Sequence, residues 1–298
     1  MATAAKTLSG EQSPQAAKSL PWKTIAWFGG LLILCYAPVL WRLVTEWWNN
    51  EDMGHGFFVP LVAGFIVWKR RDELAAVEPR TNYWGLLIVL FGALQFTVGT
   101  LGAERFLAQT AFIVSLAGAV LFAGGARVFK LVAFPLFLLC FMIPLPQTIY
   151  SQITLPLQIF ASSVAETVLG WIGIPVLRHG NQLELAGQTL NVVEACSGIR
   201  SLLSLSFLAL IYGYLFDNKA WMRWVLLLAT VPIAITANAA RVTLTGILSD
   251  SQSKLAEGLP HKLEGLVLFM VAVALLVLVH RLANVIYRRF HRKESADA

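Results

Sequence analysis

Charged residues are scarce in this sequence: they make up 13% of its 298 residues, whereas hydrophobic residues make up 57%. This composition, with a mean hydropathy of +0.67, excludes an ordinary water-soluble domain. The basic residues behind the net charge of +6 lie beside long apolar runs. Lipid headgroups and membrane topology explain them better than nucleic acid does. The composition therefore predicts a polytopic membrane protein that does not bind nucleic acid.

Cysteine is also scarce, with three residues in the whole chain. Cys35 and Cys140 fall inside apolar runs, where a thiol ordinarily packs as a small hydrophobic group. Cys196 alone stands among polar residues, so the three cannot form a disulfide framework. No Cys/His cluster has the spacing of metal ligands. We therefore expect neither a metal centre nor a cofactor.

Long apolar runs divide the chain into segments near the roughly 20 residues that a membrane-crossing helix needs. We place eight spans near residues 24–44, 53–68, 83–102, 106–125, 129–146, 198–216, 221–241 and 264–284. Runs of Leu, Ala, Phe and Val with little two-residue alternation favour helices over a β-barrel. The sequence thus predicts an all-α membrane protein, a polytopic bundle of about eight transmembrane helices with a small outer-face segment.

The distribution of Lys and Arg sets the expected orientation in the membrane. With a cytoplasmic N-terminus, 16 of the 23 basic residues fall on the inner side. The positive-inside rule then places both termini in the cytoplasm, in a bacterial inner membrane. We expect a polar cytoplasmic tail over 1–23, a transmembrane domain over 24–284 and a basic cytoplasmic tail over 285–298.

One stretch inside the transmembrane domain, 147–195, is less apolar and is expected on the outer face. Its first half, 147–168, is predicted to be an amphipathic helix in the membrane interface. Its second half alternates Leu with polar residues, which predicts a small hairpin over the bundle. A second outer segment is expected over 242–263.

Cys196 lies where the first outer segment meets the sixth span. At a helix N-terminus, free N–H groups and the helix dipole lower the pKa of a thiol from its reference value of about 8.5. Ser197 and Gly198 suit a helix start, and Arg200 would add positive potential one turn on. From this segment alone, a small residue that fills a helix junction is the other interpretation.

Arg241 is predicted at the outer end of the seventh span. A lone arginine there often extends to the lipid headgroups, but a guanidinium can also stabilise an oxyanion, with Asn238 three residues earlier on the same face. His261, in the loop before the eighth span, is either solvated and idle or a proton carrier for Cys196. His55 is a weaker candidate on the same side. The other histidines are expected at the surface or in the cytoplasm: His179, His280 and His291.

Together these blocks resemble the exosortase/archaeosortase family. The resemblance rests on Glu194–Leu202, on Asn238–Arg241, on the late His261, on Gly54–Leu61, on Ile143–Pro146 and on Leu155–Gln158. It runs from roughly 30 to 275 in the right order, and the Cys-Ser-Gly block is its most specific part. The Ile-Arg-Ser variant favours the bacterial, exopolysaccharide-associated type A.

The resemblance implies a multi-pass cysteine protease and transpeptidase. Such an enzyme recognises C-terminal sorting signals of the PEP-CTERM type, which are a Pro-Glu-Pro motif, a transmembrane helix and a basic tail. It cleaves membrane-anchored precursors through a cysteine thioester and transfers them to an acceptor amine or hydroxyl, on a lipid or a glycan. The family roles fall on Cys196 as nucleophile, Arg241 as oxyanion stabiliser and His261 as general acid and base, while Asn238 and His55 match supporting positions.

Two other functions stay open from the residues alone. The chain could be a non-enzymatic component of exopolysaccharide export or assembly, in which the outer segment binds polymer or proteins and Cys196 is dispensable. It could also be an acyltransferase that moves lipid chains through a cysteine thioester, because the same nucleophile serves that chemistry.

Overall fold

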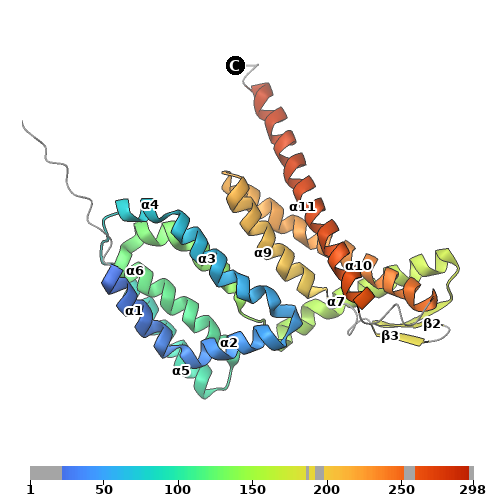
Figure 1. Cartoon of the computed structure of the whole chain (residues 1–298), viewed down its shortest axis with the longest axis horizontal. Helices are drawn as coiled ribbons and strands as arrows, with labels where there is room; N and C mark the ends of the chain where they lie inside the picture. Colours follow the sequence, from blue (N-terminus) through green and yellow to red (C-terminus); the bar gives the residue numbers. More distant parts are fainter. Residues whose placement is uncertain (1–21, 186–187, 192–197, 252–258, 295–298) are drawn as a thin grey trace, which may run out of the picture. The chain divides into compact units, whose positions relative to one another are not determined.

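The computed structural model describes residues 22–185, 188–191, 198–251 and 259–294, with a few side chains at the edges of these ranges left out. Most of the described chain is helical (Figure 1). It divides into two compact units, residues 1–44 with 58–140 and residues 45–57 with 141–298. Each unit is described by itself.

The first unit is an assembly of helices. Its elements are α1 (Trp22–Cys35), the first part of α2 (Ala37–Asn49), α3 (Phe58–Lys69), α4 (Arg71–Ala76), α5 (Tyr83–Leu101), α6 (Arg105–Leu138) and the start of η2 (Leu139–Met142). α5 and α6 pack most closely, because α5 presents buried glycines at seven-residue intervals, Gly85, Gly92 and Gly99. A Cβ at any of these would overlap atoms of α6. Small residues permit this close approach between membrane helices.

α6 is broken at Gly125, whose φ of +74° and ψ of −178° are not helical. Glycine is required there both for this φ and because a Cβ would overlap the carbonyl oxygen of Arg80. The break falls between the two spans expected at 106–125 and 129–146. Those two predicted spans are therefore the two halves of α6, joined without a loop.

The second unit contains every candidate site residue that the structure describes. Its elements are the end of α2, η1 (Glu51–Phe57), the end of η2, α7 (Gln147–Ile172), β1 (Val176–His179), β2 (Gln182–Leu185), β3 (Gln188–Asn191), α9 (Ile199–Phe216), α10 (Ala220–Ser251) and α11 (Leu259–Glu294). The strands form an antiparallel sheet in the order β1-β2-β3. The small hairpin expected on the alternating-Leu segment is thus a three-stranded sheet.

The sheet rests on α7 and α10. Leu183 and Leu185 alternate with the exposed Gln182 and Glu184 along β2, which is the period of a strand with one covered face. The two leucines pack in one cluster with residues of α7 and α10: Ala161, Ala165, Ala239 and Val242. This packing fixes the outer part of α10 beside the sheet.

α9, α10 and α11 share a second apolar core, built around Leu205, Met222, Leu226, Ala272 and Leu276. Near the α9–α10 connection this core ends in a polar cluster. Asp217 accepts hydrogen bonds there from the backbone N–H of Lys219 (2.9 Å) and from Nδ2 of Asn284 (3.0 Å), and Nε2 of His280 lies 3.0 Å from its Oδ2. The side chain of His280 is only 12% exposed, so of the two expected places for His280 the surface is wrong, and the cytoplasmic side stays a prediction.

Six described helices are long and apolar enough to cross a membrane, or seven if the bent pair 27–35 and 37–49 is one span. The expected all-α membrane protein is confirmed, but some expected bounds are wrong. The second predicted span is instead η1 followed by the 12-residue α3, and α7 passes the length and hydropathy test although an interfacial helix was expected. The side of the membrane on which each segment lies stays a prediction.

Candidate functional site

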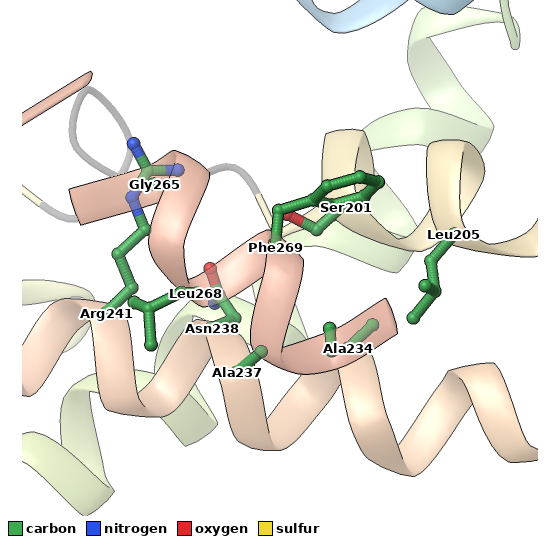
Figure 2. A pocket seen from close by; sticks show the side chains of 10 residues that line it. Ser201, Leu205, Ala234, Ala237, Asn238, Arg241, Gly265, Leu268 and Phe269 are labelled. Carbon is green, nitrogen blue, oxygen red and sulfur yellow. The ribbon is translucent and has the colours of Figure 1, made fainter. Parts of the chain in front are cut away.

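One turn of α10 carries the two polar residues around which the site is built, Asn238 and Arg241. They lie three residues apart, so both side chains leave the helix on the same side, toward α9 and α11 (Figure 2). α10 continues to Ser251, so the prediction that Arg241 ends a helix and opens a loop over 242–263 is wrong. Apolar residues and threonines at helical spacing, such as Val242, Thr243 and Thr245, continue the helix beyond the arginine.

Asn238 and Arg241 line a narrow pocket between three helices of the second unit. α9 contributes Ser201 and Leu205, and α11 contributes Gly265 and Phe269 (Figure 2). The free volume of the pocket is about 10 Å³, which is about the space of one water-sized group. The pocket therefore has room for a single oxygen atom beside polar side chains rather than for a whole peptide.

The start of α9 meets Asn238 directly. Gly198 is the N-cap of α9, with a φ of +66°. A Cβ added at Gly198 would lie 3.1 Å from Nδ2 of Asn238, so the amide of Asn238 occupies the space where another residue would have a side chain. Asn238 is buried, with 6% of its surface exposed. Glycine at 198 thus serves both the left-handed backbone and this contact.

The start of α11 meets Arg241 in the same manner. A Cβ added at Gly265 would lie 3.1 Å from Nη2 of Arg241, so the guanidinium lies against the bare backbone of α11. Beside it, Oγ1 of Thr245 donates to the carboxylate of Glu264 at 3.3 Å. Thr245 is one turn after Arg241 on α10, so this hydrogen bond holds the first turns of α11 onto the turn that carries the guanidinium.

Three predicted site residues lie wholly or partly outside the described part of the chain. Cys196 and Ser197 lie outside the described residues. His261 lies in the first turn of α11 rather than in a loop, and the description includes its backbone but not its side chain. Position 261 is four residues before Gly265, which places it on the same face of α11, one turn nearer the start of the helix.

Arg200 is placed differently from Asn238 and Arg241. Its Nε donates to Oδ1 of Asp52 in η1 at 2.8 Å, and Oδ2 of Asp52 accepts a further hydrogen bond from the hydroxyl of Tyr150 at 2.6 Å. The carboxylate offsets the charge of Arg200. Arg200 therefore adds less positive potential at the start of α9 than its sequence position indicates, and it ties η1 to α9.

His55 lies on the same side of α9 as Arg200. Its Nε2 is 3.1 Å from the carbonyl oxygen of Phe141, and its Nδ1 is 3.5 Å from Oγ of Ser204. Burial lowers the pKa of His55, although hydrogen bonds with the backbone of Phe141 and Asp52 and the charge of Asp52 act in the opposite direction. The imidazole is accordingly neutral at pH 7. It is absent from the lining of the pocket that holds Asn238 and Arg241.

Two residues that matter to the site were missed in the sequence. Gly265 is one glycine in an apolar helix, and only its spacing of four from His261 signals that it belongs to the same face. Asp52 lies two positions before the Gly-His-Gly block, but its partner Arg200 is 148 residues away, which no local pattern shows. Among the described residues, no three His, Cys, Asp or Glu side chains gather as metal ligands would.

The profile of the transmembrane exosortase (EpsH) family matches residues 47–278. This match covers more than half of the chain and includes every candidate site residue. The chain belongs to the exosortase family. The EpsH name is consistent with the exopolysaccharide-associated type, and membership indicates a membrane transpeptidase that acts on sorting signals. Searches of curated proteins and of solved structures gave no match to this exosortase.

Proposed function

We propose that this exosortase is a membrane-embedded cysteine peptidase and transpeptidase. It cleaves C-terminal sorting signals of the PEP-CTERM type from exported precursor proteins and transfers the precursor to an acceptor amine or hydroxyl on a lipid or glycan. Cys196 is the nucleophile, Arg241 stabilises the oxyanion and His261 is the general acid and base. The site faces the outer side of a bacterial inner membrane, with both termini in the cytoplasm.

A single observation carries the proposal: the starts of α9 and α11 meet over one turn of α10. Gly198 packs on Asn238, and Gly265 packs on Arg241. Two residues of extended chain span at most about 7 Å, so a nucleophile at position 196 cannot be far from Gly198. Position 261 is one helical turn from Gly265. Gly198 and Gly265, which are close in sequence to positions 196 and 261, thus lie against one turn of α10.

The chemistry follows from the groups that this arrangement supplies. The thiolate of Cys196 attacks the scissile carbonyl, a C–S bond forms, and the π electrons of the carbonyl move to its oxygen. The guanidinium of Arg241 stabilises this oxyanion. His261 protonates the departing amine as the C–N bond breaks, which leaves a thioester on Cys196. The acceptor, deprotonated by His261, then attacks the thioester and releases the thiolate; water in its place gives hydrolysis.

Binding of the substrate uses its membrane anchor. The helix of the sorting signal lies in the same bilayer as the enzyme, so the cleavage site approaches the outer ends of the spans at a fixed depth. Positioning of this kind replaces a three-dimensional encounter with an intramolecular-like one and contributes strongly to rate.

The replacement Cys196→Ala tests the proposal. A reporter that ends in Pro-Glu-Pro, an apolar helix and a basic tail is produced together with the enzyme, and its conversion is followed by mass. We expect full-length reporter to accumulate, because without the thiol no thioester forms. Unchanged conversion would exclude the mechanism and favour a non-enzymatic role in exopolysaccharide export. A fatty acyl adduct on Cys196, in place of a peptide adduct, would identify an acyltransferase.

A further inference from the structure

The side-chain amide of Asn238 is a buried donor that has no acceptor among the described residues. Asn238 is 6% exposed, and its Nδ2 has no hydrogen-bond partner in the part of the chain that the structure describes. Buried polar groups are nearly always hydrogen-bonded in folded proteins, and an exception calls for an explanation. A ligand atom that accepts the bond during function is one such explanation.

The amide points at the start of α9. Nδ2 would lie 3.1 Å from a Cβ at Gly198, the N-cap of the helix, and a glycine at the N-cap has no side chain to cap the helix. The N–H groups of the first turn have no acceptor within the helix, since the first bond to the Gly198 carbonyl comes from the N–H of Leu202. Free N–H groups at a helix N-terminus, together with the helix dipole, favour an anion. Nδ2 of Asn238 and the free N–H groups of α9 therefore point to the same binding position for a ligand atom.

We propose that Nδ2 of Asn238 and the first N–H groups of α9 bind the scissile carbonyl oxygen of the substrate and stabilise it as the oxyanion. This inference rests on the proposed function and adds a catalytic residue to it. As the sulfur of Cys196 bonds to the carbonyl carbon, the negative charge moves onto the oxygen, and Nδ2–H donates to it. When the C–N bond breaks, the electrons return from the oxygen and the carbonyl of the thioester re-forms.

With this assignment, the two polar residues of α10 have different roles. Asn238 lies against α9, which follows the nucleophile, whereas the guanidinium of Arg241 lies against Gly265 of α11, on the side of His261. Asn238 is then the neutral donor closest to the nucleophile's segment. Arg241 supplies positive charge from the side of the general acid and base.

Two variants in the full chain separate this role from a purely structural one. Asn238→Ala removes the donor, and Asn238→Asp keeps the shape of the side chain while replacing Nδ2 with an acceptor. We expect both to slow conversion of the Pro-Glu-Pro reporter by roughly 100- to 1000-fold, which is the usual effect of losing one oxyanion donor. Alkylation of Cys196 by iodoacetamide forms no oxyanion. In Asn238→Ala, the rate of this alkylation should therefore stay within about twofold of the rate in the enzyme that keeps Asn238.

The control is Asn284→Ala, which also removes a partly buried asparagine but lies 19 residues beyond Gly265 in α11, roughly 28 Å along the helix. Its conversion rate should stay close to that of the unmodified enzyme. Unchanged conversion in Asn238→Ala, near-normal conversion in Asn238→Asp, or an equal loss of conversion and alkylation would each overturn the inference. In all three cases the proposed function stands if Cys196→Ala blocks conversion, and it fails separately if Cys196→Ala does not.

Discussion

At the residue scale, Gly180 and Gly198 both have a positive φ but differ in their surroundings. Their φ values are +65° and +66°. A Cβ at Gly180 would have nothing within 4 Å, whereas a Cβ at Gly198 would meet the amide of Asn238. Alanine substitutions at the two glycines therefore separate the effect of a positive φ on stability from the effect of crowding Asn238.

We expect Gly180→Ala to lower stability by about 1 kcal/mol, the cost of a left-handed alanine, with little effect on activity. Gly198→Ala also places an alanine at a positive φ, and it displaces Asn238 as well, so conversion of the reporter should fall by roughly 100-fold. Thermal unfolding in detergent and the conversion rate measure the two effects. Equal activity in the two variants would contradict a close fit at position 198.

Single residues also show what the sequence could and could not reveal about the site. The spacing of Asn238 and Arg241 predicted a shared helix face, and the structure places them so. The partners of these residues could not be predicted, because Gly198 and Gly265 act by lacking a side chain, and a glycine in an apolar run looks the same whether or not a polar group packs on it. For Cys196, Ser197 and the side chain of His261, the expected roles stay predictions.

At the element scale, α9 is held at both ends by polar contacts that no local pattern predicted. Near its start, Arg200 binds Asp52 of η1, and the loop after its end contains Asp217, which is bound by residues of α11. Strand alternation, by contrast, predicted a hairpin where the three-stranded sheet lies, and the predicted end of a span at residue 125 coincides with the break in α6. The end of α10 was misplaced because a charged residue at a membrane interface is compatible with a continuing helix.

Asp217 makes the stability of this connection depend on pH. Burial alone would raise its pKa, but the hydrogen bonds from Lys219, Asn284 and His280 and the Lys219 ammonium lower the pKa from 3.8 to about 2. A carboxyl group with a lower pKa in the folded state stabilises the protein fully above its unfolded pKa. Its contribution is therefore lost as the pH falls from about 4 to about 2.

The matched variant is Asp217→Asn, which keeps the size of the side chain but cannot ionise. The melting temperatures of the enzyme with Asp217 and of the Asp217→Asn variant are compared in detergent. Their difference should be constant just above pH 4 and shrink below it. A difference that does not change over that interval would show that the carboxylate is not stabilised as the hydrogen bonds indicate.

At the scale of the whole molecule, large hydrophobic residues lie both in the protein core and on its surface. Large apolar side chains are exposed on most of the long helices, including Leu101, Trp171, Leu228 and Val267, as expected where lipid covers them. Composition alone therefore predicted the membrane class and most of the spans. It could not decide whether α7 crosses the membrane, because α7 is both moderately apolar and partly polar.

Labelling from one side of the membrane decides whether α7 crosses it. If α5 and each half of α6 cross the membrane, as the sequence predicts, residues 78 and 179 lie on opposite sides, and a further crossing by α7 would put them on the same side. In a background with Cys35, Cys140 and Cys196 replaced by Ser, we expect a membrane-impermeant maleimide to label His179→Cys in intact spheroplasts. Glu78→Cys should react only after permeabilisation. Both positions are exposed, so equal labelling of the two would mean that α7 crosses the membrane.

The common origin of Asn238 and Arg241 on one turn of α10 limits how the enzyme can open. Rotation or sliding of α10 carries both groups together, so their mutual spacing survives any rigid movement of that helix. Access for a peptide must then come from displacement of the start of α9 or of α11, each of which rests on α10 through a glycine. The α9 contact lies at the start of the helix that follows position 196, and the α11 contact lies one turn after position 261.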